Sequence, residues 1–290
     1  MSTRTVSTRT VEPVALQYRF FAAHVVRARR VGASLIRVTF GGAELVDFAG
    51  GGRDQSVSLF LPQPGQDAPV VPVERGEDWF DAWRALPSDV RAVMRSYTIR
   101  EHRPPAGEVD IDFVGHGGTG PASRWASLAG LGDRVLLLGP AVYDNRSVCF
   151  RPPDDTDLVV LAADETALPA TAGILAWLPA GTRVRAWIEV PDAADITELP
   201  TEAAAEIRWI VRGSTAPGSD LLVSALRAAR LPAVAPYAWI AGESGVVRAL
   251  RRHLVGERGF DRRRVTFAGY WRRGLSEEDL RAEALAGATA

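Results

Sequence analysis

Hydrophobic residues in the first half of the chain fall into short runs that glycine and proline separate. The runs are rich in β-branched and aromatic residues and cover 18–31, 34–40, 56–61, 94–101, 108–115 and 134–138. Many short strands with turn residues between them are typical of antiparallel barrels. Helical patterns interrupt the series only around 78–86 and from Gly120 onward. We therefore predict a six-stranded antiparallel β-barrel.

Beyond residue 156 the pattern changes to alternating strands and helices. The run 157–163 is continuously apolar, as in strands buried in a parallel sheet, and 166–178 follows with helical spacing. Further strands are expected at 183–190, 207–212, 237–241 and 265–270, and further helices at 219–230, 244–258 and 276–285. Ser276 and Asp279 resemble a capping box for the last helix. This alternation predicts a doubly wound α/β domain with a parallel sheet.

The segment 151–157 has the proline and aspartate content of an interdomain linker. We place the barrel domain at 17–152 and the α/β domain at 153–290. The first 16 residues contain the pentapeptide Ser-Thr-Arg-Thr-Val twice, and we expect them to form a disordered tail.

Charge and composition exclude several classes of partner. The 290 residues carry a formal net charge of -1, which gives no basic field for nucleic acid or an anionic membrane. No apolar run approaches the ~20 residues that span a bilayer, so we expect a cytoplasmic protein, and we expect a monomer. All 34 basic residues are arginine, so any fixed cation that meets an anionic ligand is a guanidinium.

Cysteine and histidine are too few and too scattered for a metal site. Cys149 is the only cysteine, which excludes an internal disulfide, and we expect its thiol to be buried and inert. The four histidines form no ligand pair of transition-metal spacing. No Ser-His-Asp or Cys-His arrangement is evident either, so we predict no resident metal and no catalytic nucleophile.

The first informative motif is Arg-Ser-Tyr-Thr-Ile-Arg at 95–100. On a strand, Arg95 and Tyr97 share one face. They offer a guanidinium for phosphate and an aromatic ring for stacking, and Thr98 adds a hydroxyl. An amphipathic strand with solvated arginines would give the same pattern, so the motif is weak by itself.

The second motif, at 116–126, passes from glycines into a helix with Pro121 in its first turn. Such a helix start presents unpaired N–H groups and the positive end of the helix dipole to an anion, and a diphosphate fits there. A Gly-rich turn before an ordinary helix is the plain structural alternative. The Arg-Ser-Tyr-Thr strand motif precedes it in the same chain, and a chance occurrence of both motifs together is a poor explanation.

Three further segments follow strands of the α/β domain, at 162–170, 241–244 and 269–274. Ligands of open α/β sheets bind at the carboxyl ends of strands. The Gly-x-Gly-x-x-Gly fingerprint of the usual dinucleotide fold is absent.

Taken in order, these motifs resemble the siderophore-interacting proteins, or siderophore ferric reductases, of the ferredoxin–NADP reductase-like superfamily. The resemblance extends from about Tyr18 to Arg273 and includes Gly-Pro at 139–140, Asp-Glu-Thr-Ala-Leu-Pro-Ala at 164–170, Ala-Gly-Glu-Ser at 241–244 and Gly-Tyr-Trp-Arg-Arg-Gly at 269–274. It implies an FAD-binding barrel, an NAD(P)H-binding-like domain and a ferric siderophore as substrate.

The same resemblance implies a set of cofactor-binding residues. Those for the flavin ring and phosphate are Arg95, Ser96, Tyr97, Thr98 and Arg100. Those for the diphosphate are His116, Gly118, Gly120, Pro121, Ala122 and Ser123. Those expected from the second domain are Asp164, Thr166, Ala167, Glu243 and Trp271, with Thr166 and Ala167 closing over the isoalloxazine and Trp271 near the flavin or nicotinamide.

The substrate site departs from the family. Ser58 stands where members often carry a lysine that helps to hold an anionic ferric siderophore. Arg53, Arg124, Arg248 and Arg272 are the candidate substitutes, although each is more typical of a solvated surface arginine.

We therefore predict an FAD-dependent oxidoreductase that takes electrons from NADH or NADPH and reduces chelated Fe(III) to Fe(II). Glu189 at a strand end suggests a free ribose hydroxyl, and Arg212 suggests a 2′-phosphate, so the sequence leaves the choice of nicotinamide open. One alternative keeps the flavin but uses ferredoxin as donor or a non-iron acceptor. Another is a ferric-chelate binding protein without redox turnover.

Overall fold

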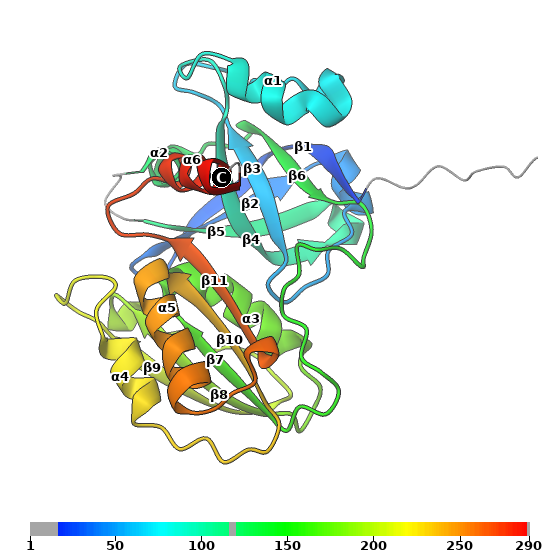
Figure 1. Ribbon diagram of the computed structural model, residues 1–290. Coiled ribbons are helices and arrows are strands. Elements are labelled where there is room, and N and C mark those ends of the chain that lie inside the picture. Colours follow the sequence, from blue (N-terminus) through cyan, green and yellow to red (C-terminus); the bar gives the residue numbers. More distant parts are fainter. Residues whose placement is uncertain (1–16, 116–119, 289–290) are drawn as a thin grey trace, which may run out of the picture.

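The computed structural model describes residues 17–115 and 120–288. Its first half is a closed antiparallel barrel with the strand order β1-β2-β5-β4-β3-β6 (Figure 1). The strands are β1 (Tyr18–Val31), β2 (Leu35–Gly41), β3 (Ser56–Leu61), β4 (Val93–Arg103), β5 (Glu108–Val114) and β6 (Arg134–Pro140). The predicted six-stranded barrel is confirmed, because every apolar run forms one of these strands.

Alternating side chains of the strands fill the barrel. Phe21, Val38, Phe40, Ile111 and Phe113 are fully buried in one apolar cluster. Two helices lie on the barrel: α1 (Trp79–Ala85) and α2 (Pro121–Leu128), whose alanines pack onto the same cluster. Closure of the sheet leaves it no free edge, so ligand contacts are made at the outer face of the barrel and at its junction with the second domain.

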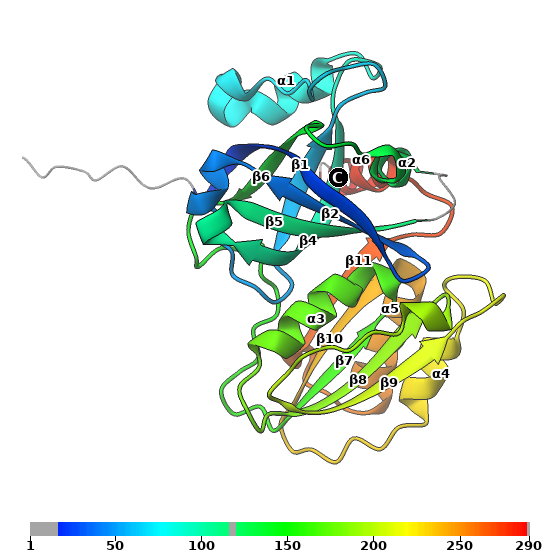
Figure 2. The same ribbon diagram turned by 180° about the vertical axis from the view of Figure 1, so that it is seen from behind.

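The second half is a five-stranded parallel sheet with the order β11-β10-β7-β8-β9. The strands are β7 (Leu158–Ala163), β8 (Arg183–Val190), β9 (Ala204–Val211), β10 (Pro236–Glu243) and β11 (Val265–Trp271). The helix α3 (Leu168–Trp177) covers one face, and α4 (Leu221–Arg227) and α5 (Ser244–Arg252) cover the other (Figures 1 and 2). The doubly wound α/β prediction is confirmed.

The last helix, α6 (Glu277–Ala288), leaves the α/β domain and lies on the barrel beside α2 (Figures 1 and 2). Its predicted capping box is present: Ser276 N donates to Asp279 Oδ2 at 3.0 Å, and Asp279 N donates to Ser276 Oγ at 3.2 Å. The two domains are therefore joined through both the linker after β6 and the segment before α6.

Polar and backbone contacts fix the two domains together. The carboxylate of Asp195 accepts hydrogen bonds from Ser34 N and Ser34 Oγ, both at 2.7 Å. On α3, Gly173 lies so close to the loop before β3 that a Cβ there would be 2.3 Å from the carbonyl oxygen of Arg53. Any larger residue at this position would push the domains apart.

Two further expectations concern Cys149 and the N-terminal residues 1–16. The prediction that Cys149 is buried is wrong: the residue is exposed, because the segment after β6 runs over the surface rather than as a strand. The expected tail at 1–16 lies outside the described residues. No helix in the described part of the chain is both long and apolar enough to cross a bilayer.

Candidate functional site

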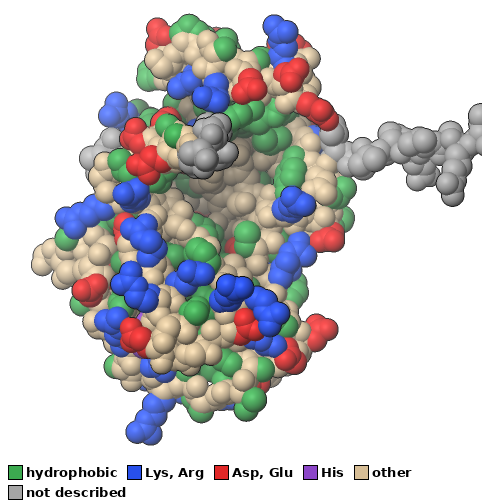
Figure 3. All heavy atoms as spheres, in the orientation of Figure 1, with side chains coloured by type: hydrophobic (Ala, Val, Ile, Leu, Met, Phe, Trp, Pro, Cys, Tyr) green, Lys and Arg blue, Asp and Glu red, His purple; other side chains and the backbone are tan. Residues whose placement is uncertain are grey.

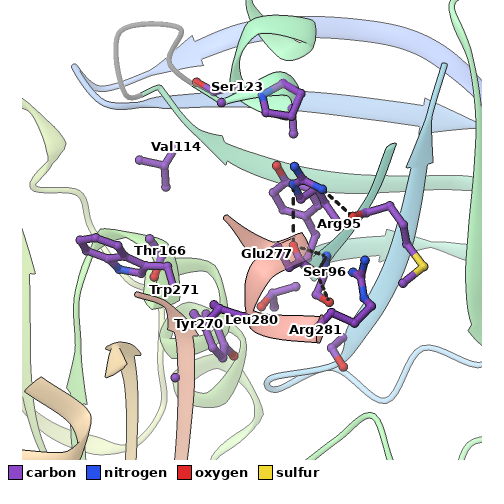
Figure 4. A pocket seen from close by; sticks show the side chains of 18 of the residues that line it. Arg95, Ser96, Val114, Ser123, Thr166, Tyr270, Trp271, Glu277, Leu280 and Arg281 are labelled. Atoms are coloured by element: carbon purple, nitrogen blue, oxygen red, sulfur yellow. Dashed lines mark hydrogen bonds and ion pairs between the residues drawn. The ribbon is translucent and has the colours of Figure 1, made fainter. Parts of the chain in front are cut away.

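A cavity of about 560 Å³ lies where the barrel, the α/β domain and α6 meet, and the surface is hollowed there (Figures 3 and 4). Ten of the predicted cofactor residues line it: Arg95, Ser96, Tyr97, Thr98, Gly120, Pro121, Ala122, Ser123, Thr166 and Trp271. The fold thus brings together motifs that are up to 176 positions apart in the sequence.

Strand β4 supplies the barrel wall of the cavity. The ring of Tyr97 packs on Phe113 with centroids 4.5 Å apart, which fixes the orientation of its plane. Burial raises the pKa of Tyr97, so the phenol stays protonated and neutral. The Thr98 hydroxyl is hydrogen-bonded to Tyr270 of β11, which ties the strand to the second domain. The Arg95 side chain is only 12% exposed.

The start of α2 supplies the second wall. Gly120 is the N-cap and offers no side-chain cap, Pro121 opens the helix, and both line the cavity, so the N-terminus of α2 lies at this wall. The hydroxyl oxygen of Ser123 is buried and has no hydrogen-bond partner among the described residues. The Ser123 hydroxyl, a helix N-terminus and the Arg95 guanidinium together fit a diphosphate.

The α/β domain supplies the third wall through Asp164. This carboxylate accepts hydrogen bonds from Thr166 N at 2.9 Å, Glu243 N at 2.8 Å and Trp271 Nε1 at 2.8 Å. Burial and the neighbouring Glu165 raise the pKa of Asp164 to about 6. Asp164 lies behind the wall and holds Thr166 and Trp271 at the cavity.

Gly242 makes that arrangement possible. Its φ of +139° is one that L side chains rarely adopt, and a Cβ there would lie 2.5 Å from Asp164 Oδ2. The Ala-Gly-Glu-Ser segment therefore acts here by making room for a carboxylate.

The fourth wall is α6, which sequence reasoning assigned no role. Glu277, Leu280 and Arg281 line the cavity (Figure 4). Glu277 and Glu278 both form ion pairs with Arg95. No local signal in the sequence indicates these contacts, because they join residues more than 180 positions apart.

Known proteins match both halves of the chain. The profile of the siderophore-interacting FAD-binding domain matches residues 24–144, and that of the siderophore-interacting protein matches residues 156–274. Ferric vibriobactin reductase of Vibrio cholerae is 30% identical over 257 residues, 87% of this chain and 89% of that protein. The chain belongs to the siderophore-interacting protein family.

Two more relatives agree with this membership. NADPH-dependent ferric-chelate reductase of Escherichia coli is 32% identical, over 87% of this chain and 93% of that protein. The crystal structure of a siderophore utilization protein from T. fusca superimposes with a TM-score of 0.75 at 36% identity, over 90% of this chain and 95% of that one. The predicted resemblance is confirmed, and the barrel is the FAD-binding domain of an oxidoreductase family.

Several residues expected at the cofactor in this siderophore-interacting protein lie elsewhere. Ala167 is fully buried and is not among the cavity-lining residues, and the Glu243 carboxylate caps α5 by accepting from Val246 N at 2.9 Å. Arg100 does not line the cavity; burial and the nearby Arg37 lower its pKa. The remaining two, His116 and Gly118, lie outside the described residues.

Arg53, a candidate for the siderophore, is engaged in the domain interface. Its guanidinium donates to Gly51 O at 3.2 Å and Phe150 O at 3.4 Å, and lies 4.8 Å from the ring centroid of Trp177. Its φ of +55° is left-handed, which the close packing of α3 maintains. These contacts give Arg53 a structural task.

The other three candidate arginines lie outside the cavity lining. Arg124 on α2 and Arg248 on α5 are exposed, and Arg272 pairs with Glu283 of α6 at 2.9 Å. Arginine side chains gather on the α/β side of the hollow (Figure 3). Ser58, in place of the family's lysine, lies on β3 opposite Ser96.

Arg212, a candidate for a 2′-phosphate, is buried between two carboxylates at the ends of the parallel strands. It donates to Glu165 at 2.6 and 3.0 Å and to Glu189 at 2.9 Å, and its side chain is 5% exposed. Arg212 therefore supplies the counter-charge of both Glu165 and Glu189. This network directs the Arg212 guanidinium at the two carboxylates.

Proposed function

We propose that this siderophore-interacting protein is an FAD-dependent ferric-siderophore reductase that takes its electrons from NADH or NADPH. The observation that carries the proposal is the cavity itself, which is lined by an arginine, hydroxyl groups and a helix N-terminus of the barrel domain and by hydroxyl and aromatic groups of the α/β domain. Support comes from the names of the relatives, which include a ferric vibriobactin reductase, a ferric acinetobactin reductase and an NADPH-dependent ferric-chelate reductase.

In this proposal each wall has its own task. Arg95, the Ser123 hydroxyl and the N-terminus of α2 hold the diphosphate, because they supply positive charge and hydrogen-bond donors. Tyr97 offers its ring to the isoalloxazine, and Thr98 offers a hydroxyl to its edge. From the other domain, Thr166 and Trp271, held by Asp164, cover the opposite side of the site and limit the access of water.

When bound, FAD supplies the redox chemistry: a hydride from reduced nicotinamide enters as an electron pair, and two Fe(III) chelates each leave with one electron, with release of one proton overall. The protein's own residues position the reactants and need donate no nucleophile. Because Fe(II) binds hard oxygen ligands more weakly than Fe(III), reduction loosens the chelate and frees the iron.

We also propose that the anionic chelate docks against exposed arginines, and Arg248 of α5 is the first of them to replace. Replacement by Gln removes a charge without shortening the chain much, so Arg248→Gln should raise KM several-fold and leave kcat within about twofold. Arg185→Gln, a surface change on β8 away from the cavity, is the matched control.

The first test is an anaerobic visible spectrum of the FAD-loaded protein. NADH or NADPH is added alone, and then a ferric hydroxamate or catecholate chelate together with an Fe(II)-specific chromogenic ligand. Bleaching of the flavin bands by nicotinamide, followed by their return as Fe(II) appears, is the expected result. Flavin that stays oxidised with both nicotinamides would overturn the proposed donor, and bleached flavin that the chelate does not reoxidise would overturn the acceptor.

A further inference from the structure

The first turn of α6 occupies the anion-binding groups of β4. Ser96 N donates to Glu277 Oε1 at 3.1 Å, and the Ser96 hydroxyl donates to the same oxygen at 3.0 Å. Arg95 forms ion pairs with both Glu277 and Glu278 (Figure 4). Two carboxylates thus satisfy a guanidinium, an amide and a hydroxyl that face the cavity.

Carboxylate and phosphate compete for such groups because both are anions that accept several hydrogen bonds at once. The diphosphate of FAD carries two negative charges, and so do Glu277 and Glu278 together. One Arg95 guanidinium cannot pair fully with both anions, and two anions held side by side in a half-buried cavity repel each other.

The helix that carries these carboxylates is joined to the fold in a way that allows it to move as a unit. The capping box of Ser276 and Asp279 stabilises its first turn from within. Gly274, with φ of +80°, stands in the short connection from β11. Besides the β4 contacts, Glu283 pairs with Arg272 of that same connection at 2.9 Å, and Arg281 lies 5.8 Å from the ring centroid of Trp83 on α1.

We propose that α6 is an internal competitor for FAD: in the cofactor-free chain Glu277 and Glu278 occupy the diphosphate groups of Arg95 and Ser96, and the helix withdraws from them when FAD binds. This rests on the proposed role of Arg95 in holding the diphosphate. The consequence is that α6 returns to Arg95 and Ser96 whenever FAD leaves. The affinity of the site for FAD is therefore set partly by this helix.

The test is FAD binding to the full-length apoprotein. Quenching of flavin fluorescence reports the binding, both at equilibrium and in stopped flow. The variant is the double change Glu277→Gln and Glu278→Gln, which keeps the shape of both side chains but removes their charge. Its Kd for FAD should fall at least about tenfold, since two charge-assisted contacts no longer compete. Glu283→Gln, one charge on the same helix but paired with Arg272 instead, should stay within about twofold of wild type.

A second measurement uses the unaltered chain and does not depend on how the variants fold. Amide hydrogen exchange of the peptide 276–288 should become faster when saturating FAD is added, because the helix loses its β4 contacts. An unchanged or higher Kd in the double variant, or slower exchange with FAD, would overturn the competitor and show that α6 holds the cofactor instead.

Neither measurement contains nicotinamide or an iron chelate. Failure of the competitor therefore leaves the proposed reductase intact. A wild-type chain that bound no FAD at all would overturn both.

Discussion

The indole Nε1 of Trp239 on β10 donates a hydrogen bond to Asp54 Oδ2 at 2.9 Å, across the boundary between the barrel and the α/β domain. The same carboxylate accepts from Cys149 N at 3.1 Å and from Phe150 N at 3.0 Å in the linker. Asp54 is 4% exposed, so one buried side chain joins the two domains and the segment between them.

Asp54→Ala should therefore destabilise the protein by about 2–4 kcal/mol, because two buried N–H donors and one partly buried donor lose their acceptor. Urea unfolding of the variant and the wild type measures the difference. Asp47→Ala is the control: its carboxylate is 71% exposed and pairs with Arg19, so the loss should stay within about 1 kcal/mol. Equal losses in the two variants would contradict the interdomain role.

Arg95→Ala should weaken FAD binding by roughly 10- to 150-fold, the equivalent of about 1.5–3 kcal/mol for one charged hydrogen-bond partner. The flavin content of the purified variant and a titration with FAD measure this. Arg84→Ala, an exposed arginine of α1, should keep wild-type affinity. Stoichiometric flavin retained by Arg95→Ala would count against the role of Arg95 at the diphosphate.

The raised pKa of Asp164 predicts a pH dependence of stability. A carboxyl group whose pKa is about 6 when folded and about 4 when unfolded binds its proton more tightly in the folded state. Its contribution to stability is therefore full below about pH 4 and is lost as the pH rises to about 6, a change of roughly 3 kcal/mol. Denaturant unfolding at pH values between 4 and 7 measures the slope.

Asp164→Asn is the comparison for that slope, since it cannot ionise. The difference in unfolding free energy between wild type and variant should fall between pH 4 and 6 and stay level above. A constant difference over the whole range would show that Asp164 does not titrate there.

Arg212→Met should destabilise the α/β domain by about 3–5 kcal/mol, because it leaves Glu165 and Glu189 buried without a counter-charge. Burial already raises the pKa of Glu189, and the loss of Arg212 raises it further. Protonation then relieves the repulsion, so the deficit should be smaller at pH 5 than at pH 8. Thermal unfolding at both pH values measures it.

Arg185→Met provides the matched control for this network. Arg185 pairs with Glu206, whose side chain is 63% exposed, so its removal should cost less than about 1 kcal/mol at either pH. A deficit of Arg212→Met that does not depend on pH would mean that Glu189 stays ionised over this range.

Much of the fold could be predicted because its signals are local. The buried strand β7 is a continuous apolar run, and the capping box before α6 consists of residues three positions apart. The α2 start is likewise visible in sequence, since Gly120 and Pro121 specify how that helix begins. In the cavity, Arg95 and Tyr97 were predictable because motif order and strand alternation place them together.

What sequence reasoning missed depends on contacts between distant residues. Arg212 looks like a free cation in sequence, but its carboxylate partners are 23 and 47 positions away. Similarly, Glu277 and Glu278 look in sequence like the ordinary acidic first turn of a helix. Only the tertiary structure brings them to Arg95 of the barrel. Charge at a position is local information, whereas the identity of its partner is decided by tertiary packing.

The return of α6 to the barrel also has a mechanical consequence. Because the backbone crosses between the domains twice, once after β6 and once before α6, two bodies are joined at two points. Two domains joined at two points are restricted to rotation about the line through both connections. The cavity lies beside one of these joints, so any separation of the domains would also displace the segment that leads into α6.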